Sequence, residues 1–221
     1  MSPAAERATG RAPGFPPAER FMPARRTLPA LRRAVDACRA CPLYLRATQG
    51  VFGEGPAPAR LMMVGEQPGD REDLAGRPFV GAAGRMLDRM LDEAGLAREE
   101  IYLTNAVKHF KFEQRGKRRI HKKPSVTEVH ACFPWLEVEL ARVRPEMVVC
   151  LGATALRAVL GRAPRVERDR GKVFSTDRVP WVMPTYHPSA LVRAPEGVRE
   201  RARAAFLEDL GLVAARLRSL H

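Results

Sequence analysis

The sequence has few cysteines, few aromatic residues and no long apolar run. Cysteine occurs four times in 221 residues, and aromatic residues make up 6% of the chain. No apolar stretch approaches the length of a membrane span, and no charged segment followed by an apolar stretch resembles an export leader. We therefore expect a cytoplasmic protein that makes no contact with a membrane. In such a chain, cysteines are better suited to metal or redox chemistry than to disulfides.

Acidic residues are also scarce relative to basic ones. The chain contains 25 Asp and Glu against 38 Lys and Arg, which gives a formal net charge of +13. Clustered cations attract phosphates and release their counterions, so the excess favours a polyanionic partner. A general bias towards arginine would produce the same excess. The hydrophobic fraction of 45% is sufficient for one domain with a full core, and nothing in the sequence requires more than a monomer.

The chain divides into a tail and one domain. Residues 1–27 are rich in Pro, Ala and Arg without lasting periodicity, which predicts a disordered tail, and the domain spans 28–221. Four apolar runs have the length of buried strands: 61–64, 101–106, 147–151 and 181–184. Helical patterns alternate with them, notably at 85–94, 126–143 and 198–217. This alternation predicts a three-layer α/β/α sandwich around a mainly parallel four-stranded sheet.

A polar loop follows the first of these strands. It reads Gly65-Glu66-Gln67-Pro68-Gly69-Asp70, with Phe79 a few residues beyond. Open α/β sheets bind ligands at the carboxyl ends of their strands. A loop that presents Glu66, Gln67 and Asp70 near an aromatic ring suits a flat, polar ligand such as a nucleobase. A purely structural turn could have the same composition.

Two further polar residues occupy comparable positions. Asn105 follows the strand run that starts at residue 101, and His187, before Pro188, follows the run at 181–184. The residue before a proline is held extended, which favours exposure of His187 in the crevice. An Asn amide offers both a donor and an acceptor. A surface histidine, a turn asparagine and a core Phe79 remain the alternatives.

The cysteines fall into a pair and two distant singles. Cys38 and Cys41 form a Cys-x-x-Cys pair, Cys132 lies on the apolar face of an expected helix, and Cys150 lies in the strand run 147–151. These positions are compatible with one four-thiolate site. Zinc and a 4Fe–4S cluster both accept four thiolates, so spacing does not separate them. Two core cysteines beside an unrelated pair are the alternative.

Together these motifs resemble a known family. The 65–69 loop and the His187-Pro188-Ser189 string resemble motifs of the iron–sulfur branch of the uracil-DNA glycosylase superfamily, in the same order. Ordinary family-four members carry Ala where this chain has Gln67. That difference, with Asp70 and the basic string Lys117-Arg118-Arg119-Ile120-His121, resembles the UdgX subgroup and its inserted loop. The resemblance covers about residues 30–217.

The resemblance implies a specific chemistry. The protein would excise uracil from DNA, preferably single-stranded, after which His121 would attack C1′ and stay covalently attached. His187 would donate to uracil O2, and Glu66 or Asp70 would stabilise the sugar cation, while Asn105 would read the base and Phe79 would stack on it. The remaining site residues implied are Gln67 as catalytic, and Gly65, Arg193, Lys117, Arg118 and Arg119 as substrate-binding. A structural 4Fe–4S cluster would be held by Cys38, Cys41, Cys132 and Cys150.

Three other functions remain open at this stage. An ordinary family-four glycosylase would turn over and release abasic DNA. A non-catalytic iron–sulfur module could bind DNA through the same basic charge. A zinc adaptor could use the same four thiolates.

Overall fold

A four-stranded parallel sheet forms the centre of the computed structural model, which describes residues 12–161 and 165–219. The strands are β1 (Leu61–Gly65), β2 (Ile101–Asn105), β5 (Met147–Leu151) and β6 (Trp181–Thr185). Their order is β2-β1-β5-β6, and all three pairings are parallel. The predicted α/β sandwich is therefore confirmed, and each strand lies within one residue of its expected bounds.

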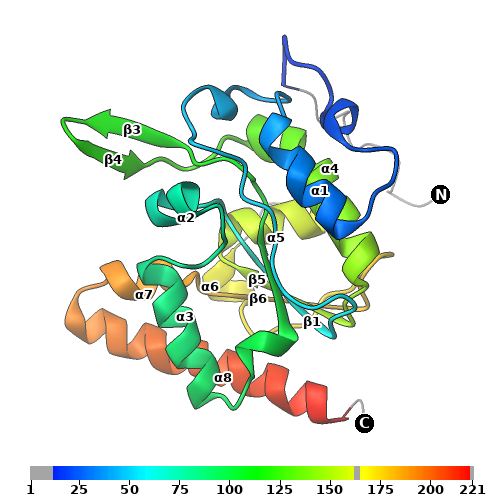
Figure 1. Ribbon diagram of the computed structural model, residues 1–221. Coiled ribbons are helices and arrows are strands. Elements are labelled where there is room, and N and C mark those ends of the chain that lie inside the picture. The colour runs from blue at the N-terminus through cyan, green and yellow to red at the C-terminus, as the bar shows by residue number, and fades with distance from the viewer. Residues whose placement is uncertain (1–11, 162–164, 220–221) are drawn as a thin grey trace.

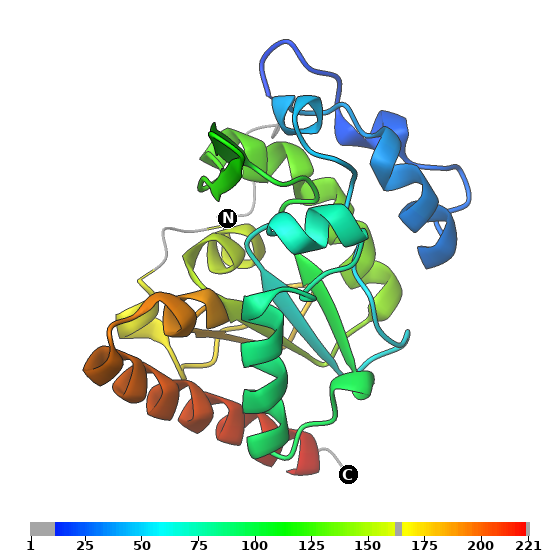
Figure 2. The same cartoon turned by 60° about the vertical axis from the view of Figure 1, so that its left-hand side comes forward.

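Helices cover both faces of this sheet (Figures 1 and 2). One face packs against α1 (Leu28–Ala34), α4 (Val126–Val143) and α5 (Ala153–Leu160). The other packs against α3 (Ala82–Glu93), α7 (Pro188–Arg193) and α8 (Glu196–Ser219). The shorter helices are α2 (Asp70–Ala75), α6 (Val166–Asp169), η1 (Ala18–Phe21), η2 (Val35–Ala37), η3 (Pro42–Leu45) and η4 (Arg98–Glu100).

Burial on both faces explains why the strands read as continuous apolar runs. In β1, Met62 and Val64 pack into the core beneath α4, whereas Leu61 and Met63 pack into the core beneath α3 and α8. The start of α4 is fixed by a capping box between Ser125 and Glu128, as the sequence spacing indicates. The layers thus hold the four strand ends rigidly beside one another.

The basic loop of the sequence analysis is an ordered hairpin. Strands β3 (Phe112–Arg115) and β4 (Arg118–His121) pair antiparallel, and Gly116 takes a positive φ of 58° at the turn. Figure 1 shows the hairpin reaching out from the body of the domain beside α2. His121 ends β4, at the base of the hairpin.

The expectation of a disordered tail over residues 1–27 is wrong for residues 12–27. Residues 1–11 lie outside the described part of the chain. From residue 12 on the chain packs against the domain: Ala12 and Ala18 are 3% and 2% exposed and join the core on the α4 side. Periodicity detects regular elements only, so it misses an irregular segment that buries small side chains. Among the described helices, none has the length and apolarity needed to cross a membrane.

Candidate active site

The carboxyl ends of the four parallel strands surround a cavity of about 380 Å³. The ends of β1, β2 and β6 and the loops after them contribute polar side chains, β5 contributes Leu151 and the residues after it, and His121 lines the cavity from the end of β4. Of the residues that the sequence assigns to the site, the cavity is lined by Glu66, Gln67, Asp70, Phe79, Asn105, His121, His187 and Arg193. Residues from distant parts of the chain therefore meet at one site, as the resemblance implies.

Glu66 connects the hairpin to the sheet. Its Oε1 lies 3.3 Å from Nε2 of His121, and its Oε2 accepts a hydrogen bond from the hydroxyl of Thr154 in the first turn of α5. Burial acts to raise the pKa of Glu66, but the contacts with His121 and Thr154, together with nearby His187, lower it overall. Glu66 is therefore a carboxylate at neutral pH, with one oxygen available to orient the imidazole.

His187 is held as a neutral hydrogen-bond donor. It is the N-cap of α7, where its Nδ1 accepts from the backbone N–H of Ser189 at 3.1 Å. Burial lowers its pKa to about 4; Arg193 and His121 add to that effect, and Glu66 opposes it. A neutral imidazole that accepts at Nδ1 carries its proton on Nε2. That N–H is the donor that His187 can offer to a ligand.

Asn105 has a side chain that is buried yet free to bind. The residue is 3% exposed and lines the cavity. Within the described part of the chain, no protein group hydrogen-bonds its side-chain amide. Among the described residues no buried side-chain nitrogen or oxygen lacks a partner, so the amide atoms of Asn105 reach the surface of the cavity. There they can bind a ligand edge with a complementary donor and acceptor.

Gly65 leaves room for two side chains that line the cavity, Asn105 and Phe79. A Cβ at Gly65 would lie 2.4 Å from Oδ1 of Asn105 and 2.7 Å from Cζ of Phe79, so no larger residue fits there. Phe79 is 5% exposed, has a positive φ of 57°, and its ring lies 6.3 Å from the ring of His187 at an interplanar angle of 25°. Phe79, with this sparsely populated backbone conformation, lines the cavity beside His187.

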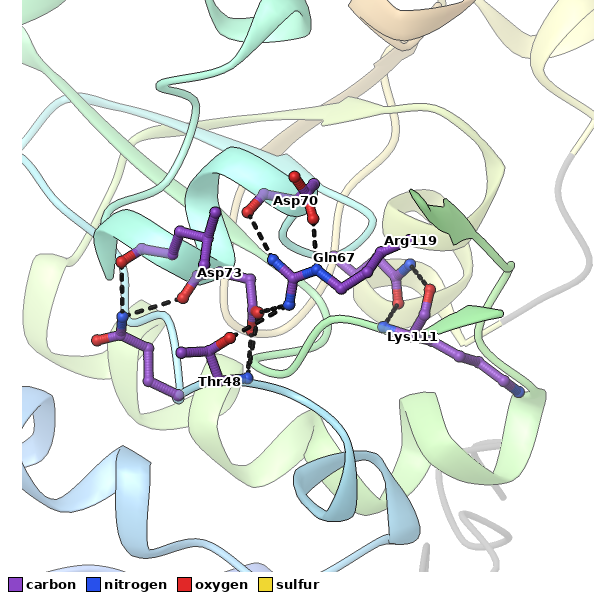
Figure 3. A network of polar contacts seen from close by, with 8 residues as sticks. Thr48, Gln67, Asp70, Asp73, Lys111 and Arg119 are labelled. Carbon is purple, nitrogen blue, oxygen red and sulfur yellow. Dashed lines mark hydrogen bonds and ion pairs between the residues drawn. The ribbon is translucent and has the colours of Figure 1, made fainter. Parts of the chain in front are cut away.

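Gln67 contacts the hairpin and not the reacting groups. Its Nε2 donates to the Lys111 carbonyl and its Oε1 accepts from the Lys111 N–H, both at 3.1 Å (Figure 3). Its Nε2 also donates to the carbonyl of Lys122 at 3.0 Å. Its amide is committed to the hairpin backbone, which suits a positioning role, while its place in the cavity lining leaves the catalytic role of Gln67 a prediction. An alanine here could make none of these bonds.

Arg119 fastens the hairpin to α2. Its guanidinium contacts Asp70 at 2.5 Å and the fully buried Asp73 at 2.6 Å, and it also bonds to the hydroxyl of Thr48 (Figure 3). We expected Arg119 to bind phosphates and Asp70 to act in catalysis. Each charge has a partner in the other, and both expected roles stay predictions, since Asp70 also lines the cavity.

The remaining cations expected at the substrate lie at the surface. Lys117 and Arg118 are exposed at the hairpin turn, where their charges face solvent. Arg193, at the end of α7, lines the cavity and donates to the hydroxyl of Ser189 at 3.1 Å. These positions leave all three side chains accessible to a polyanion.

Three of the four cysteines are close enough to influence one another. Burial raises the pKa of Cys41 to about 11, and Cys38 adds to the rise. Burial also raises the pKa of Cys132, with Cys41 and Cys38 as further causes. N–H groups donate to two of the sulfurs: Trp135 Nε1 to Cys38 and the Lys108 backbone to Cys132, both at 3.2 Å. Such donors favour thiolates, the form that binds metal.

Cys150 has a different environment, and His109 is a second buried group with a metal-binding side chain. Burial alone raises the pKa of Cys150, with no contribution from another cysteine. His109 follows Lys108 directly, is 4% exposed, and has no hydrogen-bond partner for its ring within the described residues. Burial, then Arg39, lowers the pKa of His109 to about 4. The sequence analysis considered cysteines only and did not weigh His109 as a ligand.

The described residues contain no group of three or more His, Cys, Asp or Glu side chains placed to hold a single metal ion. A cubane cluster differs from a single ion, because each of its irons takes its own ligand. The three interacting thiols, with N–H donors at two sulfurs, fit the donor chemistry of such a cluster, and the fourth ligand stays open between Cys150 and His109.

Comparisons with known proteins identify the family of the chain. Residues 52–211 match the sequence pattern described as the uracil DNA glycosylase superfamily. A type-4 uracil-DNA glycosylase of Thermotoga maritima is 39% identical over 177 residues, which cover 80% of this chain and 87% of that protein. A type-4 uracil-DNA glycosylase of Archaeoglobus fulgidus is 36% identical over 183 residues, covering 79% and 87%.

Among solved structures, the crystal structure of wild-type SMUG2 from Pedobacter heparinus is similar in fold. The two share 12% sequence identity, with a TM-score of 0.50 over 68% of this chain and 74% of the other. At this identity the likeness supports the fold alone. It agrees with the sandwich architecture described above.

Proposed function

The chain belongs to the uracil DNA glycosylase superfamily, and from that premise we propose that it excises uracil from DNA. The observation that carries this proposal is the free amide of buried Asn105 beside the neutral donor His187 in one cavity. The amide matches the donor and acceptor of the uracil edge, and Phe79 supplies a stacking face. A base can reach this cavity only when it is single-stranded or flipped out of the duplex.

The two carboxyl-end loops have complementary roles in cleavage. When the bond between N1 and C1′ breaks, its electron pair goes to uracil and the sugar becomes an oxocarbenium ion. The Nε2–H of His187 stabilises the charge on uracil O2, because a fixed donor needs no reorganisation as the charge develops. The negative charge of the Glu66 carboxylate stabilises the positive charge on the sugar.

We propose further that His121, and not water, captures the sugar. With one ring nitrogen bonded to Glu66, the other has a lone pair that can form a bond to C1′. The proton on the first nitrogen neutralises the resulting imidazolium by moving to Glu66. Gln67 and Arg119 support this step by holding the hairpin at the mouth of the cavity. The resemblance to the UdgX subgroup points the same way.

The curated relatives favour a second outcome. They are named type-4 uracil-DNA glycosylases and share up to 39% of their residues with this chain. In an ordinary glycosylase of this kind, water would attack the sugar and abasic DNA would be released. The two outcomes use the same Asn105 and His187 and differ only in the nucleophile.

We propose that the DNA backbone is bound by Arg193, which lines the cavity, and by Lys117 and Arg118, which are exposed at the turn of the hairpin. These contacts would weaken as salt rises. An open cavity with a basic hairpin suits a single strand, and we propose that the protein acts on it as a monomer in the cytoplasm.

We propose that a 4Fe–4S cluster is held by Cys38, Cys41 and Cys132, with Cys150, as the sequence suggests, or His109 as fourth ligand. Excision involves no redox step, so the role of the cluster is to join the segment around η2 and η3 to α4. Zinc bound by the same ligands would be distinguished from the cluster by the visible spectrum, because zinc does not absorb visible light.

The test is a denaturing gel of the protein mixed with a labelled single-stranded oligonucleotide containing one uracil. We expect a slow band that survives heat and detergent and is absent with thymine. Alkali-sensitive scission without that band would contradict capture and support ordinary turnover. If neither the band nor the scission appears, the result contradicts excision and favours a non-catalytic DNA-binding module.

A further inference from the structure

A fully buried ion pair lies directly behind the base-reading asparagine. Lys108 and Glu139 have side chains with no exposure, and the Lys108 Nζ lies 2.5 Å from Oε2 of Glu139. Buried pairs of this kind are often no more stabilising than apolar residues of the same volume, because both charges lose their hydration. Stability alone therefore gives little reason for a lysine at this position.

Every donor of the Lys108 ammonium has a partner. Besides Glu139, it donates to the hydroxyl of Thr104 at 2.7 Å and to the backbone carbonyl of Asn105 at 2.8 Å. An ammonium has three N–H groups, so this set uses all of them. One of the three bonds thus ends on the residue whose side chain enters the cavity.

Glu139 connects the lysine to two further residues, Gly53 and Tyr102. Its Oε1 accepts from the Gly53 N–H at 2.9 Å and from the Tyr102 hydroxyl at 3.1 Å. Burial, and then Glu139 itself, raise the pKa of Tyr102, so the phenol stays a donor. The pair is consequently anchored to α4, to β2 and to the segment that precedes β1.

The Asn105 carbonyl is the last of β2, where the strand leaves the sheet. The following N–H groups bond to the first loop: Ala106 to the Gly65 carbonyl and Val107 to the Glu66 carbonyl. The Asn105 carbonyl takes no part in these contacts, and the Lys108 ammonium fixes it by donating a hydrogen bond to it. The orientation of the Asn105 peptide sets the direction of its side chain, which has no other hydrogen bond within the described residues.

We propose that Lys108, held by Glu139, is a positioning residue for uracil recognition: it fixes the Asn105 peptide so that the free amide faces the base. This inference rests on the proposed excision of uracil. It predicts that removing the ammonium slows excision only when Asn105 is present, because the effect acts on that side chain alone.

The test compares single-turnover rates of uracil release by the full-length, cluster-containing protein. The neutral variant Lys108→Met with Glu139→Gln keeps an acceptor for Gly53 and Tyr102 and leaves no buried charge. We expect it to fold with unchanged visible absorption and to release uracil about 10- to 100-fold more slowly, the usual effect of a misplaced contact group. In an Asn105→Ala background, the same pair of substitutions should cost less than about threefold.

Two further variants separate positioning from stability. Lys108→Gln with Glu139→Gln keeps an N–H donor for the Asn105 carbonyl and should recover most of the rate that methionine loses. Leu140→Ala, which removes a buried side chain of α4 outside this network, should lower the unfolding temperature without slowing release. If the methionine pair does not fold, the glutamine pair is compared with Glu139→Gln alone, with and without Asn105: the loss from shortening the donor must appear with Asn105 and vanish in Asn105→Ala, and no difference between the two backgrounds overturns the inference.

The outcomes distinguish the two proposals. A wild-type protein that releases no uracil overturns the proposed function and this inference with it. An active wild type whose Lys108 variants lose the same factor with and without Asn105 overturns the inference alone. Equal rates for the glutamine and methionine variants overturn it as well.

Discussion

The Nε2 atom of His121 lies 3.3 Å from Oε1 of Glu66, although His121 ends a hairpin and Glu66 follows a strand of the central sheet. The contact aligns an imidazole with a carboxylate whose pKa is lowered. A carboxylate that orients an imidazole is the usual support of a histidine nucleophile or base. The predictions for capture follow from this pair.

Replacing His121 by alanine should abolish the denaturant-stable adduct. Uracil release should persist, because Asn105 and His187 are unchanged and water can enter where the imidazole was. The measurement is the denaturing gel with and without alkali treatment of the product. An adduct that survives in His121→Ala would show that another residue is the nucleophile.

Replacing Thr154 by valine should slow adduct formation about tenfold, the loss expected for one hydrogen bond to a charged group. The hydroxyl of Thr154 holds one oxygen of Glu66, and without it the carboxylate can rotate away from His121. Serine keeps the hydroxyl and is the matched control. The time course of adduct formation in single-turnover conditions measures the effect, and equal rates for valine and serine would refute it.

Loosening the hairpin should reduce capture more than excision. Arg119→Lys keeps the charge but loses the planar fork that spans Asp70 and Asp73, and Gln67→Ala removes three bonds to the hairpin backbone. We expect both variants to release uracil near the wild-type rate, with a smaller share of product trapped as adduct. Arg115→Ala, an exposed change on the same hairpin, is the control and should leave that share unchanged.

The sequence predicts the fold and most of the cavity correctly, for a physical reason. Apolar runs such as 61–64 and 147–151 are buried on both faces, and the polar residues that follow parallel strands necessarily meet at one edge. Glu66, Asn105 and His187 are recognisable for that reason. The strand-end rule says where a side chain lies, and the chemistry of that side chain says what it can do there.

What the sequence could not supply is the partner of each polar group. Arg119 reads as a phosphate ligand in a basic string, yet Asp70 and Asp73 occupy its guanidinium. Lys108, Thr154 and His109 carry no local motif, because their roles depend on contacts between elements that are distant in the chain. Residues 12–27 lack periodicity but still pack, so composition misjudges them.

The stability of the protein should fall between pH 6.5 and about 4 because of His187. Burial lowers the folded-state pKa of His187 from 6.5 to about 4, with Arg193 and His121 adding to the effect and Glu66 opposing it. In that window the unfolded chain binds a proton that the folded protein does not, so the free energy of unfolding decreases as the pH falls. Urea unfolding at pH 7 and pH 5 measures it, and His187→Asn should show a smaller decrease than wild type.

Substitutions at the thiols should identify the fourth ligand of the cluster. Cys132 interacts with Cys38 and Cys41, so Cys132→Ala should lose the broad visible absorption and most of the bound iron. Cys150 shows no such interaction, so we expect Cys150→Ala to keep both. His109→Ala should lower the iron content and change the spectrum, because the buried imidazole lies beside Lys108, whose backbone contacts Cys132. The reverse pattern, with a colourless Cys150→Ala and an unchanged His109→Ala, would assign the fourth position to Cys150, and colourless wild-type protein containing zinc would contradict the cluster itself.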